Sequence, residues 1–487
     1  MTKLSPSLPR SIAIVGGGCA GTLVAVQLLR QSRAPVRVIL IERNPPVGCG
    51  LAYGTECGDH LLNVPAERMS ALPDDPAHFL KWAQARAGHL GFPDSIGADD
   101  FLPRWIYGRY LGEALEEAKR FASRTVTFQM VVGEAVNLEE SEVGPLLTLS
   151  DGRTLEVDAV VLALGVLPGE YPIRRALPFY RTARYVHSPL LPAAMSGVAK
   201  RDDLLIVGAG LTAVDIIVQC RQLGHRGVIH ALSRRGLRPL AHDPALAPYP
   251  AFLSAETLPL TLAQTLHRVR AEVRRASASG VDWRAVLDSI RPVSQLLWQG
   301  YTWEERARFM RHVRPFWDAL RHRISPATAA IVAEMEAAGR LRFHAGRLVS
   351  LRDTPEGAAA IIKPRGREDF VALRVAKVIN CTGPRTDYSK YQHPLLINLL
   401  AAGLIGHDPL ALGIDAFPTG EVRRYGGRRA GWLFTLGAPL KGVLWESTSV
   451  SEIRVQAHDL ARRLLALKAS SGPALSGLIG HHRTSAG

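Results

Sequence analysis

The sequence predicts an α/β protein with two Rossmann-like units, the second inserted into the first, and a helical subdomain within the insertion. Two glycine-rich turns, beginning at Gly16 and Gly208, each follow a short β-branched strand and precede a helical stretch. Two later β-branched segments, residues 157–165 and 375–383, each end in a small-residue turn. With 487 residues, 47% of them hydrophobic, the chain is long enough for about three folding units and is neither disordered nor a coiled coil.

Charge and cysteine content narrow the partners that we expect. The net charge of +15 favours anionic partners, which include nucleotides, acidic small molecules, nucleic acid and membrane surfaces. The five cysteines form no CxxC pair and no zinc-like cluster with histidine, so we expect free thiols in the cytoplasm and no metal site. Glycines interrupt the uncharged stretch 11–29, so we interpret it as a buried strand and helix and expect no membrane partner.

The first glycine turn has the arrangement that a dinucleotide requires. Gly16 allows the tight turn, Gly18 lets the backbone approach a pyrophosphate, and Gly21 allows the helix to pack closely on the strand. Glu42 ends the next predicted strand, where a carboxylate can accept hydrogen bonds from a ribose diol. This order of elements predicts a dinucleotide with its pyrophosphate at the helix N-terminus.

The second glycine turn repeats this pattern with one change. Gly208 and Gly210 again precede a helix, and Arg234 lies 26 residues after Gly208, the spacing that separates the first turn from Glu42. An arginine therefore stands where the first unit has its acid. A ribose 2′-phosphate favours arginine there, so Arg234 and Arg235 predict NADPH in preference to NADH. The alternative is that both arginines are solvated surface charges.

The chain order is that of two-dinucleotide flavoproteins, in which an NAD(P)H domain is inserted into an FAD domain. We expect the small-residue turns at Gly165 and Gly383 to pass close to the two nucleotides. The predicted FAD domain covers 8–200 and 370–468, the NAD(P)H domain covers 200–370 with a helical insertion at 255–335, and 470–487 is a disordered tail. The expected cofactors are FAD and NADPH or NADH.

The helical insertion is rich in arginine. Residues 255–325 contain twelve arginines, no lysine, seven acids and four tryptophans. This composition fits a subdomain with a tryptophan core and solvated or paired arginines; nucleic-acid binding and a cap over an anionic substrate are the alternatives. Phe309, Val313, Phe316 and Leu320 have helical spacing and predict one apolar helix face, within which Pro315 would cause a kink or restart the helix.

The last predicted helix begins after Ser449, which has capping-box spacing with Glu452. The loop before it contains Gly437 and Lys441, and a helix N-terminus here could face the pyrimidine edge of a flavin. Reduced flavin is negatively charged at that edge, so Lys441 is a candidate for stabilising it. An ordinary surface lysine is the alternative.

Further motifs carry a family resemblance. They are Gly50-Leu-Ala-Tyr-Gly-Thr, His60-Leu-Leu-Asn63-Val-Pro-Ala, Phe101-Leu-Pro-Arg104-Trp-Ile-Tyr-Gly, Asn380-Cys-Thr-Gly383-Pro and Trp445-Glu-Ser-Thr. With the glycine turns they resemble, over residues 11–467, the FAD/NAD(P)-binding family that includes bacterial FAD-dependent urate hydroxylase and aspartate N-monooxygenase. The resemblance implies FAD, a reduced nicotinamide, dioxygen and a monooxygenase activity. Chain length favours urate as substrate, with 5-hydroxyisourate as product; amino-acid N-hydroxylation is the alternative.

Three side chains are catalytic candidates because the stretch 60–69 is where such folds bring the chain to the flavin ring. Asn63 could hydrogen-bond the flavin or substrate, whereas Arg68 and Arg104 could pair with an anionic urate. Structural roles are the alternatives for each of them, such as satisfying a turn for Asn63 and holding a loop for Arg104.

Other activities stay open on the sequence. Cys49 and Cys57 lie near where disulfide reductases place their redox pair, although seven residues separate them instead of the four of a CxxxxC motif. A simple NAD(P)H dehydrogenase is a further alternative, as is a non-catalytic redox sensor that binds nucleic acid through the basic insertion. The sequence does not distinguish an oxygenase from a dehydrogenase, and it gives no oligomeric state.

Overall fold

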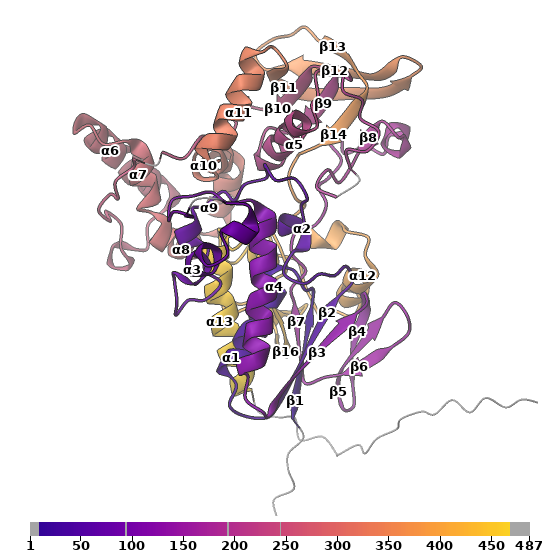
Figure 1. Cartoon of the computed structure of the whole chain (residues 1–487), viewed down its shortest axis with the longest axis vertical. Helices are drawn as coiled ribbons and strands as arrows, with labels where there is room; N and C mark the ends of the chain where they lie inside the picture. The colour runs from indigo at the N-terminus through magenta and orange to yellow at the C-terminus, as the bar shows by residue number, and fades with distance from the viewer. Residues whose placement is uncertain (1–8, 93–94, 192–193, 244, 468–487) are drawn as a thin grey trace, which may run out of the picture.

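The computed structural model describes residues 9–92, 95–191, 194–243 and 245–467, so the predicted disordered tail lies outside the described residues. Two α/β units are stacked along the long axis of the molecule, with a group of short helices beside them (Figure 1). The lower, first unit contains both ends of the described chain. The upper, second unit is formed by the middle of the sequence, as the insertion pattern predicts.

The first unit is built on a six-stranded sheet in the order β15-β16-β7-β1-β2-β3. Its strands are β1 (Arg10–Val15), β2 (Val36–Glu42), β3 (Val126–Val132), β7 (Ala159–Leu162), β15 (Glu421–Arg423) and β16 (Arg429–Thr435). All neighbours are parallel except β15 and β16. The central strand β1 carries Ala13 and Ile14 with no exposed surface, because a small sheet and helices cover its two faces.

Helices cover one face of this sheet, and a small antiparallel sheet and one helix cover the other (Figure 1). The first layer contains α1 (Cys19–Gln31), α4 (Arg104–Phe121) and α13 (Val450–Ala466). The second contains β4 (Ala135–Ser141), β5 (Gly144–Leu149), β6 (Thr154–Glu156) and α12 (Pro394–Ala401). The uncharged stretch 11–29 thus forms a buried strand and helix, as predicted. Among the described helices, none is long and apolar enough to cross a membrane.

The second unit has a seven-stranded sheet in the order β13-β12-β11-β10-β9-β14-β8. Its strands are β8 (Tyr185–Val186), β9 (Leu204–Val207), β10 (Ile229–Ser233), β11 (Leu341–Thr354), β12 (Gly357–Pro364), β13 (Val371–Val375) and β14 (Lys377–Asn380). Helices α5 (Leu211–Gln222) and α11 (Pro326–Ala337) pack on it. The unit extends beyond the predicted limits of 200 and 370, because β14 pairs with β9 and β8 pairs with β14.

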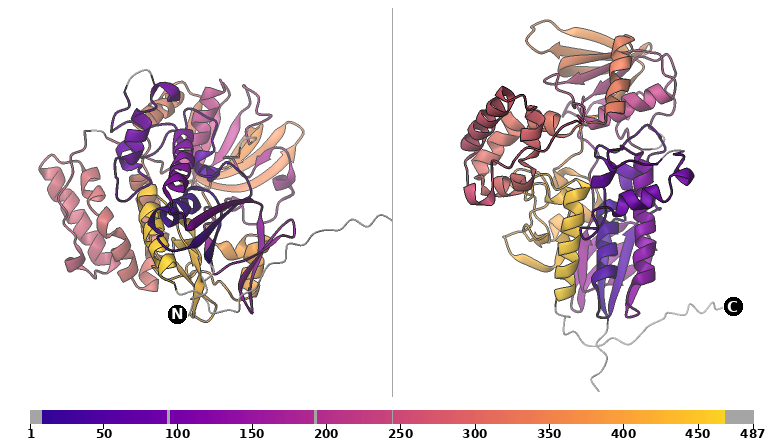
Figure 2. Two further views of the ribbon diagram at one scale, coloured as in Figure 1. Left: turned by 60° about the horizontal axis from the view of Figure 1, so that its bottom comes forward. Right: turned by 60° about the vertical axis from the view of Figure 1, so that its left-hand side comes forward.

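The helical subdomain lies between the levels of the two units in the right-hand view of Figure 2. Its helices are α6 (Leu262–Ala278), α7 (Trp283–Asp288), α8 (Ser294–Gly300), α9 (Trp303–Arg308) and α10 (Arg314–Arg321). The prediction of one apolar face through Phe316 is wrong, since this side chain is 49% exposed. A π-turn over Phe309–Val313, shortly before Pro315, lies between α9 and α10. This turn changes the helical phase, so Phe316 does not share a face with Phe309.

The core of the helical subdomain includes a residue from the first unit. Trp445, which precedes α13, stacks on Trp298 with ring centroids 4.8 Å apart and meets the edge of Phe309 at 5.1 Å. Trp298 Nε1 also donates a hydrogen bond of 2.8 Å to the carbonyl oxygen of Gly442. The segment before α13 is therefore inserted into the subdomain and fixes its position on the first unit.

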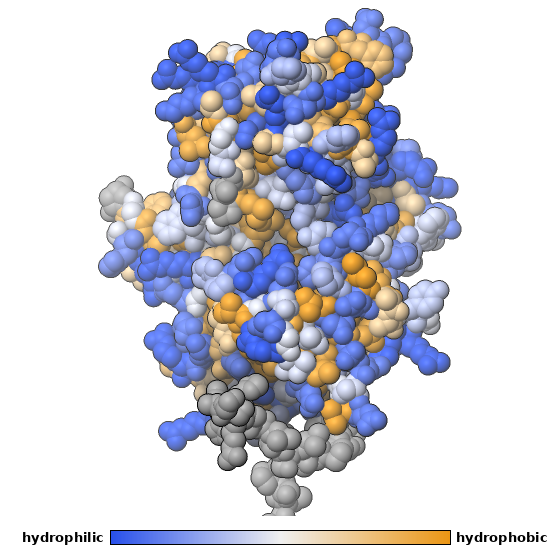
Figure 3. Space-filling view, turned by 90° about the vertical axis from the view of Figure 1, so that its right-hand side faces the viewer, coloured by the Kyte–Doolittle hydropathy of each residue, from blue (hydrophilic) through white to orange (hydrophobic). Residues whose placement is uncertain are grey.

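Shorter elements connect these parts. They are α2 (Gly50–Tyr53), α3 (His78–Gln84) and the 3₁₀ turns Ala66–Arg68, Gly88–Leu90, Pro178–Arg181, Ala255–Thr257, Arg291–Val293, Tyr388–Lys390 and Ala438–Leu440. On the face shown in Figure 3, apolar side chains lie in the hollow at the junction of the upper and lower units. Residues of both units meet at this junction.

Candidate functional site

The first glycine turn leaves no room for side chains at two of its three positions. A Cβ atom on Gly16, whose φ is +105°, would lie 2.4 Å from the carbonyl oxygen of Ala163, and one on Gly21 would lie 1.8 Å from that of Gly16. A Cβ atom on Gly18 would meet only the Cα atom of Gly50, at 3.5 Å. The space beside Gly18 is therefore kept open by absent side chains, which suits close approach of a pyrophosphate.

The surroundings of this turn fit an anionic dinucleotide. Gly18 is the N-cap of α1 and supplies no side-chain cap, so the first backbone N–H groups of the helix are available to an anion. Glu42 is held in place because Oε2 accepts a hydrogen bond of 2.6 Å from Gly17 N and Oε1 accepts one of 2.7 Å from Asn44 N. Each oxygen keeps a further lone pair with which to accept a ribose hydroxyl. The residues present fit FAD.

In the second glycine turn, too, one glycine is closely approached by backbone and another leaves open space at the helix N-terminus. Gly208, with φ of +122°, lies so close to the chain after β14 that a Cβ atom would be 1.9 Å from the carbonyl oxygen of Cys381. Gly210 is the N-cap of α5, and a Cβ atom there would meet nothing within 4 Å. Gly165 and Gly383 also have positive φ and open surroundings. These two residues sit at the turns where we expect backbone to pass a nucleotide.

Arg234 and Arg235 follow β10 at the edge of the second sheet. Among the described residues, no carboxylate pairs with either guanidinium group, and Arg235 Nη2 donates a 3.3 Å hydrogen bond to the carbonyl oxygen of Arg311. Burial and neighbouring arginines lower the pKa of Arg234. A guanidinium that is crowded by like charges is stabilised when an anion binds. The geometry is therefore compatible with the predicted role of both residues at a ribose 2′-phosphate.

Replacing Arg234 and Arg235 by glutamine should raise the apparent KM for NADPH far more than that for NADH. Each lost charge-assisted contact to a phosphate is expected to cost about 1.5–3 kcal/mol. The measurement is the initial rate of NADPH and NADH oxidation at varied cofactor concentration. Arg226→Gln is the control, because Arg226 is exposed and precedes β10 at the opposite edge of the sheet. Equal effects on the two cofactors would contradict the assignment.

A buried ion pair joins the two units. Arg104, at the start of α4, donates from Nη1 to Asp215 Oδ2 on α5 at 2.7 Å, and their side chains are 12% and 9% exposed. Arg104 Nε donates to the carbonyl oxygen of Leu61, and His60 Nε2 lies 2.9 Å from the carbonyl oxygen of Asp215. This network fixes the helix that follows the second glycine turn against the first unit.

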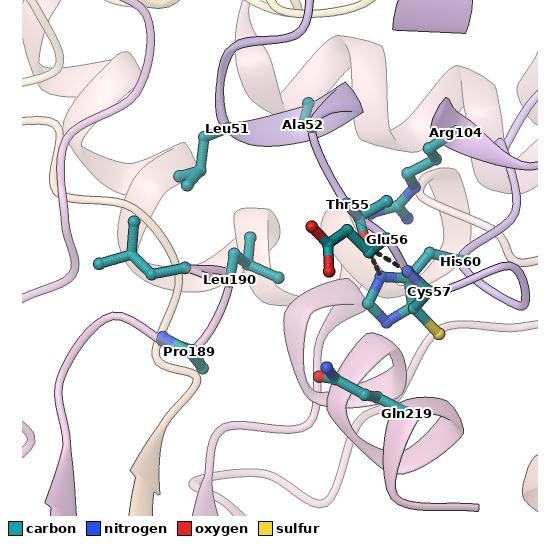
Figure 4. Close-up of a pocket in the computed structure, with 12 residues that line it drawn as sticks. Leu51, Ala52, Thr55, Glu56, Cys57, His60, Arg104, Pro189, Leu190 and Gln219 are labelled. Atoms are coloured by element: carbon teal, nitrogen blue, oxygen red, sulfur yellow. Dashed lines mark hydrogen bonds between the residues drawn. The ribbon is translucent and has the colours of Figure 1, made fainter. Parts of the chain in front are cut away.

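A small pocket lies beside this network (Figure 4). Leu51, Ala52, Pro189 and Leu190 lie on one side of it. The polar side is formed by Thr55, Glu56, Cys57, His60, Arg104 and Gln219. Its lining comes from α2, α4 and α5, so the pocket lies where the two units meet.

The three catalytic candidates near this junction have different surroundings. Arg104 Nη1 is engaged by Asp215, and the contact of Arg104 with an anionic substrate stays a prediction. Arg68 is 64% exposed and pairs with Glu67, which places it at the surface. Asn63 lies at the junction, where its carbonyl oxygen is 2.9 Å from His242 Nε2. A flavin contact by the Asn63 side chain stays a prediction.

Lys441 lies in the loop that precedes α13. A Cβ atom on Gly437 in this loop would be 3.7 Å from that of Ala20 at the start of α1, and Ser447 Oγ donates a hydrogen bond to the Gly437 carbonyl oxygen. The loop is thus closed on itself beside the first glycine turn. Lys441 Nζ lies 5.1 Å from the centroid of the Trp445 ring and has neither a hydrogen bond nor an ion pair within the described residues.

Charges of both signs surround Lys441. Arg314 and Asp318 belong to α10, His322 directly follows this helix, and Glu446 follows Trp445. Burial and Arg314 lower the pKa of Lys441, against the effect of Asp318 and Glu446, and burial also lowers that of His322. Yet the side chain of His322 is 45% exposed and that of Asp318 is 34% exposed. Lys441, Asp318, His322 and Glu446 thus form a partly exposed group of charged and titratable side chains, the Lys441 cluster.

Glu446, in the Lys441 cluster, has an unusual backbone conformation. Its φ is +62°, which is rare for a residue other than glycine and marks strain that the surrounding structure maintains. Trp317 Nε1 donates a 3.0 Å hydrogen bond to Oε1, which also lies 3.3 Å from Arg321 Nε. In the described part of the chain, Oε2 makes no hydrogen bond. No sequence signal singled out Glu446 beyond its place in the Trp445 motif.

The expected capping box at α13 is absent. The helix begins after Ser449 as predicted, but no side chain caps it. Ser449 and Glu452 are instead bound by Arg291 of the helical subdomain. Its Nη2 donates hydrogen bonds to Ser449 Oγ at 3.2 Å and to Glu452 Oε1 at 2.9 Å. The capping-box spacing therefore serves a contact between the subdomain and the last helix.

The cysteines do not resemble a redox pair. Cys49 and Cys57 are free, and Cys57 Sγ donates to Gln222 Oε1 across the junction. Burial raises the pKa of both thiols, which disfavours the thiolate that disulfide exchange requires. The described part of the chain also holds no group of three or more His, Cys, Asp or Glu side chains placed to bind a metal ion.

Comparison with known proteins identifies a family for the first part of the chain. Residues 13–167 match the family model described as FAD-NAD(P)-binding. Nitrosuccinic acid synthase of Aspergillus oryzae is 30% identical over 177 residues, which are 32% of this chain and 26% of that protein. Salicylate hydroxylase of Sarocladium schorii is 30% identical over 193 residues, which are 33% of this chain and 36% of that protein. The alignments thus span about a quarter to a third of the length of these relatives.

A solved structure shares the fold over nearly the whole chain. The ornithine N-hydroxylase from Kutzneria sp. 744, with reduced FAD, NADP⁺ and L-ornithine, covers 94% of this chain and 99% of its own, with a TM-score of 0.59 and 14% identity. Residues 13–167 thus match the FAD-NAD(P)-binding family, and the chain as a whole has the fold of a flavoprotein that binds both FAD and NADP⁺.

Proposed function

We propose that the protein is an NADPH-dependent FAD monooxygenase that hydroxylates the amino nitrogen of a small acidic amino acid, with aspartate as the first candidate. The observation that carries this proposal is the Lys441 cluster, because it presents charges of both signs. Lys441 can contact a carboxylate, and Glu446 Oε2 is free to accept a hydrogen bond from an ammonium group. An amino acid has both kinds of group.

The relatives support oxidation of an amine. Nitrosuccinic acid, named for the Aspergillus oryzae relative, is a dicarboxylic acid bearing a nitro group, so the amine that corresponds to it is aspartic acid. The structural neighbour is named for N-hydroxylation of ornithine, also an amino acid. Urate, our first expectation from the sequence, has no such support. It stays the second candidate because salicylate, named for the other relative, is likewise an aromatic anion.

The Lys441 cluster contains a group that can prepare an amine for reaction. Bound FAD would take hydride from NADPH and activate dioxygen. An amine reacts through its lone pair, so its ammonium form must lose a proton first. His322, beside Asp318, can accept this proton as a neutral imidazole.

A substrate screen tests the proposal. We expect L-aspartate to stimulate NADPH oxidation and oxygen uptake and to yield a product heavier by one oxygen atom in mass spectrometry. Succinate, which lacks the amine, is the matched control and should give no such product. Glutamate, ornithine, urate and salicylate complete the screen. Oxygenation of urate or salicylate, with none of any amine, would show that this proposal is wrong.

Lys441→Met should raise the KM for the amino acid without slowing flavin reduction by NADPH. Loss of one charge-assisted contact to a carboxylate predicts an increase of about tenfold or more. Stopped-flow absorbance at the flavin band measures reduction, and steady-state oxygen uptake measures KM. Lys363→Met, at an exposed position in β12, is the control. A slower reduction with unchanged KM would instead favour contact between Lys441 and the flavin.

A further inference from the structure

A third arginine lies beside Arg234 and Arg235 because of strand register. Strands β10 and β11 are parallel, and Ser233, the last residue of β10, pairs with Ala345 on β11. β11 continues past this pair, so Arg347 lies two residues farther along, on the same side of the strand as Ala345. Its guanidinium group therefore stands next to the two arginines that follow β10.

A fourth arginine comes from the helical subdomain. Arg235 Nη2 donates to the carbonyl oxygen of Arg311, in the π-turn that leads into α10. Arg314 is the first residue of α10, one helical turn after Arg311, and contributes to the repulsion that Arg234 experiences. Arg314 therefore lies near the end of β10, on the side of the subdomain.

A fifth arginine flanks the group from the connection between the two units. The carbonyl oxygen of Glu170 accepts hydrogen bonds from Asn380 Nδ2 and Thr382 Oγ1 after β14, which holds this connection at the carboxyl edge of the second sheet. Arg174 lies four residues further along the chain and pairs with Glu170 at 3.3 Å, with 87% of its side chain exposed. It acts on Arg234 from the solvent side.

The positive charge of this arginine cluster exceeds the negative charge beside it. The cluster consists of Arg174, Arg234, Arg235, Arg314 and Arg347. In the described residues, only Glu170 and Asp318 pair with members of the cluster, each with a single arginine. Guanidinium groups are always charged, so this excess cannot be relieved by loss of protons. An anion with two negative charges would relieve it.

We propose that Arg314 of the helical subdomain and Arg347 complete the 2′-phosphate site predicted at Arg234 and Arg235, so that the phosphate of NADPH bridges the second unit and the subdomain. The phosphate of NADPH carries close to two negative charges and three acceptor oxygens. It would replace part of the contact between Arg314 Nε and Asp318 Oδ2, which are 3.2 Å apart. NADPH thereby differs from NADH in holding α10 against the second unit, next to the Lys441 cluster.

Binding of nucleotide fragments to the FAD-loaded protein tests this site without turnover. Adenosine 2′,5′-bisphosphate has the 2′-phosphate and 5′-AMP lacks it, so the ratio of their Kd values, from calorimetry, isolates the phosphate contact. Arg314→Gln and Arg347→Gln should each reduce this ratio by about tenfold or more. Arg174→Gln should change it less than about threefold, since its side chain is exposed and already paired. Arg268→Gln, exposed on α6, is the control and should leave the ratio unchanged.

Phosphorus NMR gives a second readout. Guanidinium groups favour the dianion, so the pKa of the bound 2′-phosphate should lie below that of the free ligand, and Arg314→Gln should raise it. An unchanged ratio in Arg314→Gln, with a reduced ratio in Arg234→Gln, would remove the subdomain from the site. Equal weakening of both fragments would mean that Arg314 is structural. Either result would overturn the proposal. The site does not depend on the substrate, so failure of aspartate oxygenation would leave this test intact.

Discussion

The Gly18→Val variant should be purified almost without flavin, whereas the wild-type protein should be yellow with about one FAD per chain. Gly18 has φ of −70° and ψ of −168°, which valine adopts without strain, so the backbone tolerates the change. The branched side chain would instead fill the open space between Gly18 and Gly50, where the pyrophosphate must approach. We expect the flavin content to fall to about one tenth or less.

Absorbance at the flavin band relative to protein measures this effect, and two variants complete the comparison. Gly18→Ala should retain intermediate flavin, because its Cβ atom would make an ordinary 3.5 Å contact with Gly50. Gly88→Val is the control, since Gly88 is exposed and a Cβ atom there meets nothing within 4 Å. A Gly18→Val protein that keeps a full complement of FAD would refute the assignment of the first glycine turn.

Arg104→Met should cause a large loss of stability. It leaves the carboxylate of Asp215 buried without its partner, which is expected to lower the free energy of unfolding by about 3–5 kcal/mol. Urea denaturation measures the loss. The double variant Arg104→Met/Asp215→Leu should recover much of it, because two apolar side chains of similar size can replace a buried ion pair.

Flavin reduction by NADPH should be slower in the double variant than in the wild-type protein. Asp215 lies in the second turn of α5, the helix whose N-terminus would hold the pyrophosphate of NADPH, and Arg104 anchors that helix to the unit that holds FAD. Loss of the anchor would increase the distance or angle over which hydride must transfer. If the double variant recovers both stability and the rate of reduction, the ion pair has no part in positioning the nicotinamide.

Patterns local in sequence predicted most of the fold. The glycine turns could be identified because tight backbone approach excludes every side chain, as at Gly16, Gly21 and Gly208, and because Glu42 follows at a fixed spacing. The insertion of one unit into the other followed from chain order. The π-turn before Pro315 could not be placed, because a one-residue change of helical phase has no signature in the apolar spacing.

The site was less predictable because its contacts join distant parts of the chain. Arg104 and Asp215 are 111 residues apart, and no sequence pattern pairs them, although an acid within the apolar run of α5 could have been singled out. Lys441 and His322 meet only through the packing of the subdomain on the loop before α13. Residue type and position thus identified Lys441 as a candidate but did not reveal the charged side chains around it.

Insertion of Trp445 into the helical subdomain has a consequence for biosynthesis. The subdomain helices end at Arg321, so roughly 120 residues must still be translated before Trp445 exists, which takes on the order of ten seconds. During this interval Trp298 and Phe309 lack the ring that covers them. Completion of the first sheet is delayed as well, since β16 can pair with β7 only after the middle of the chain has been translated. The second unit can fold while the ribosome is still translating, whereas the subdomain and the first unit are completed together at the end, and the nascent chain needs protection from aggregation until then.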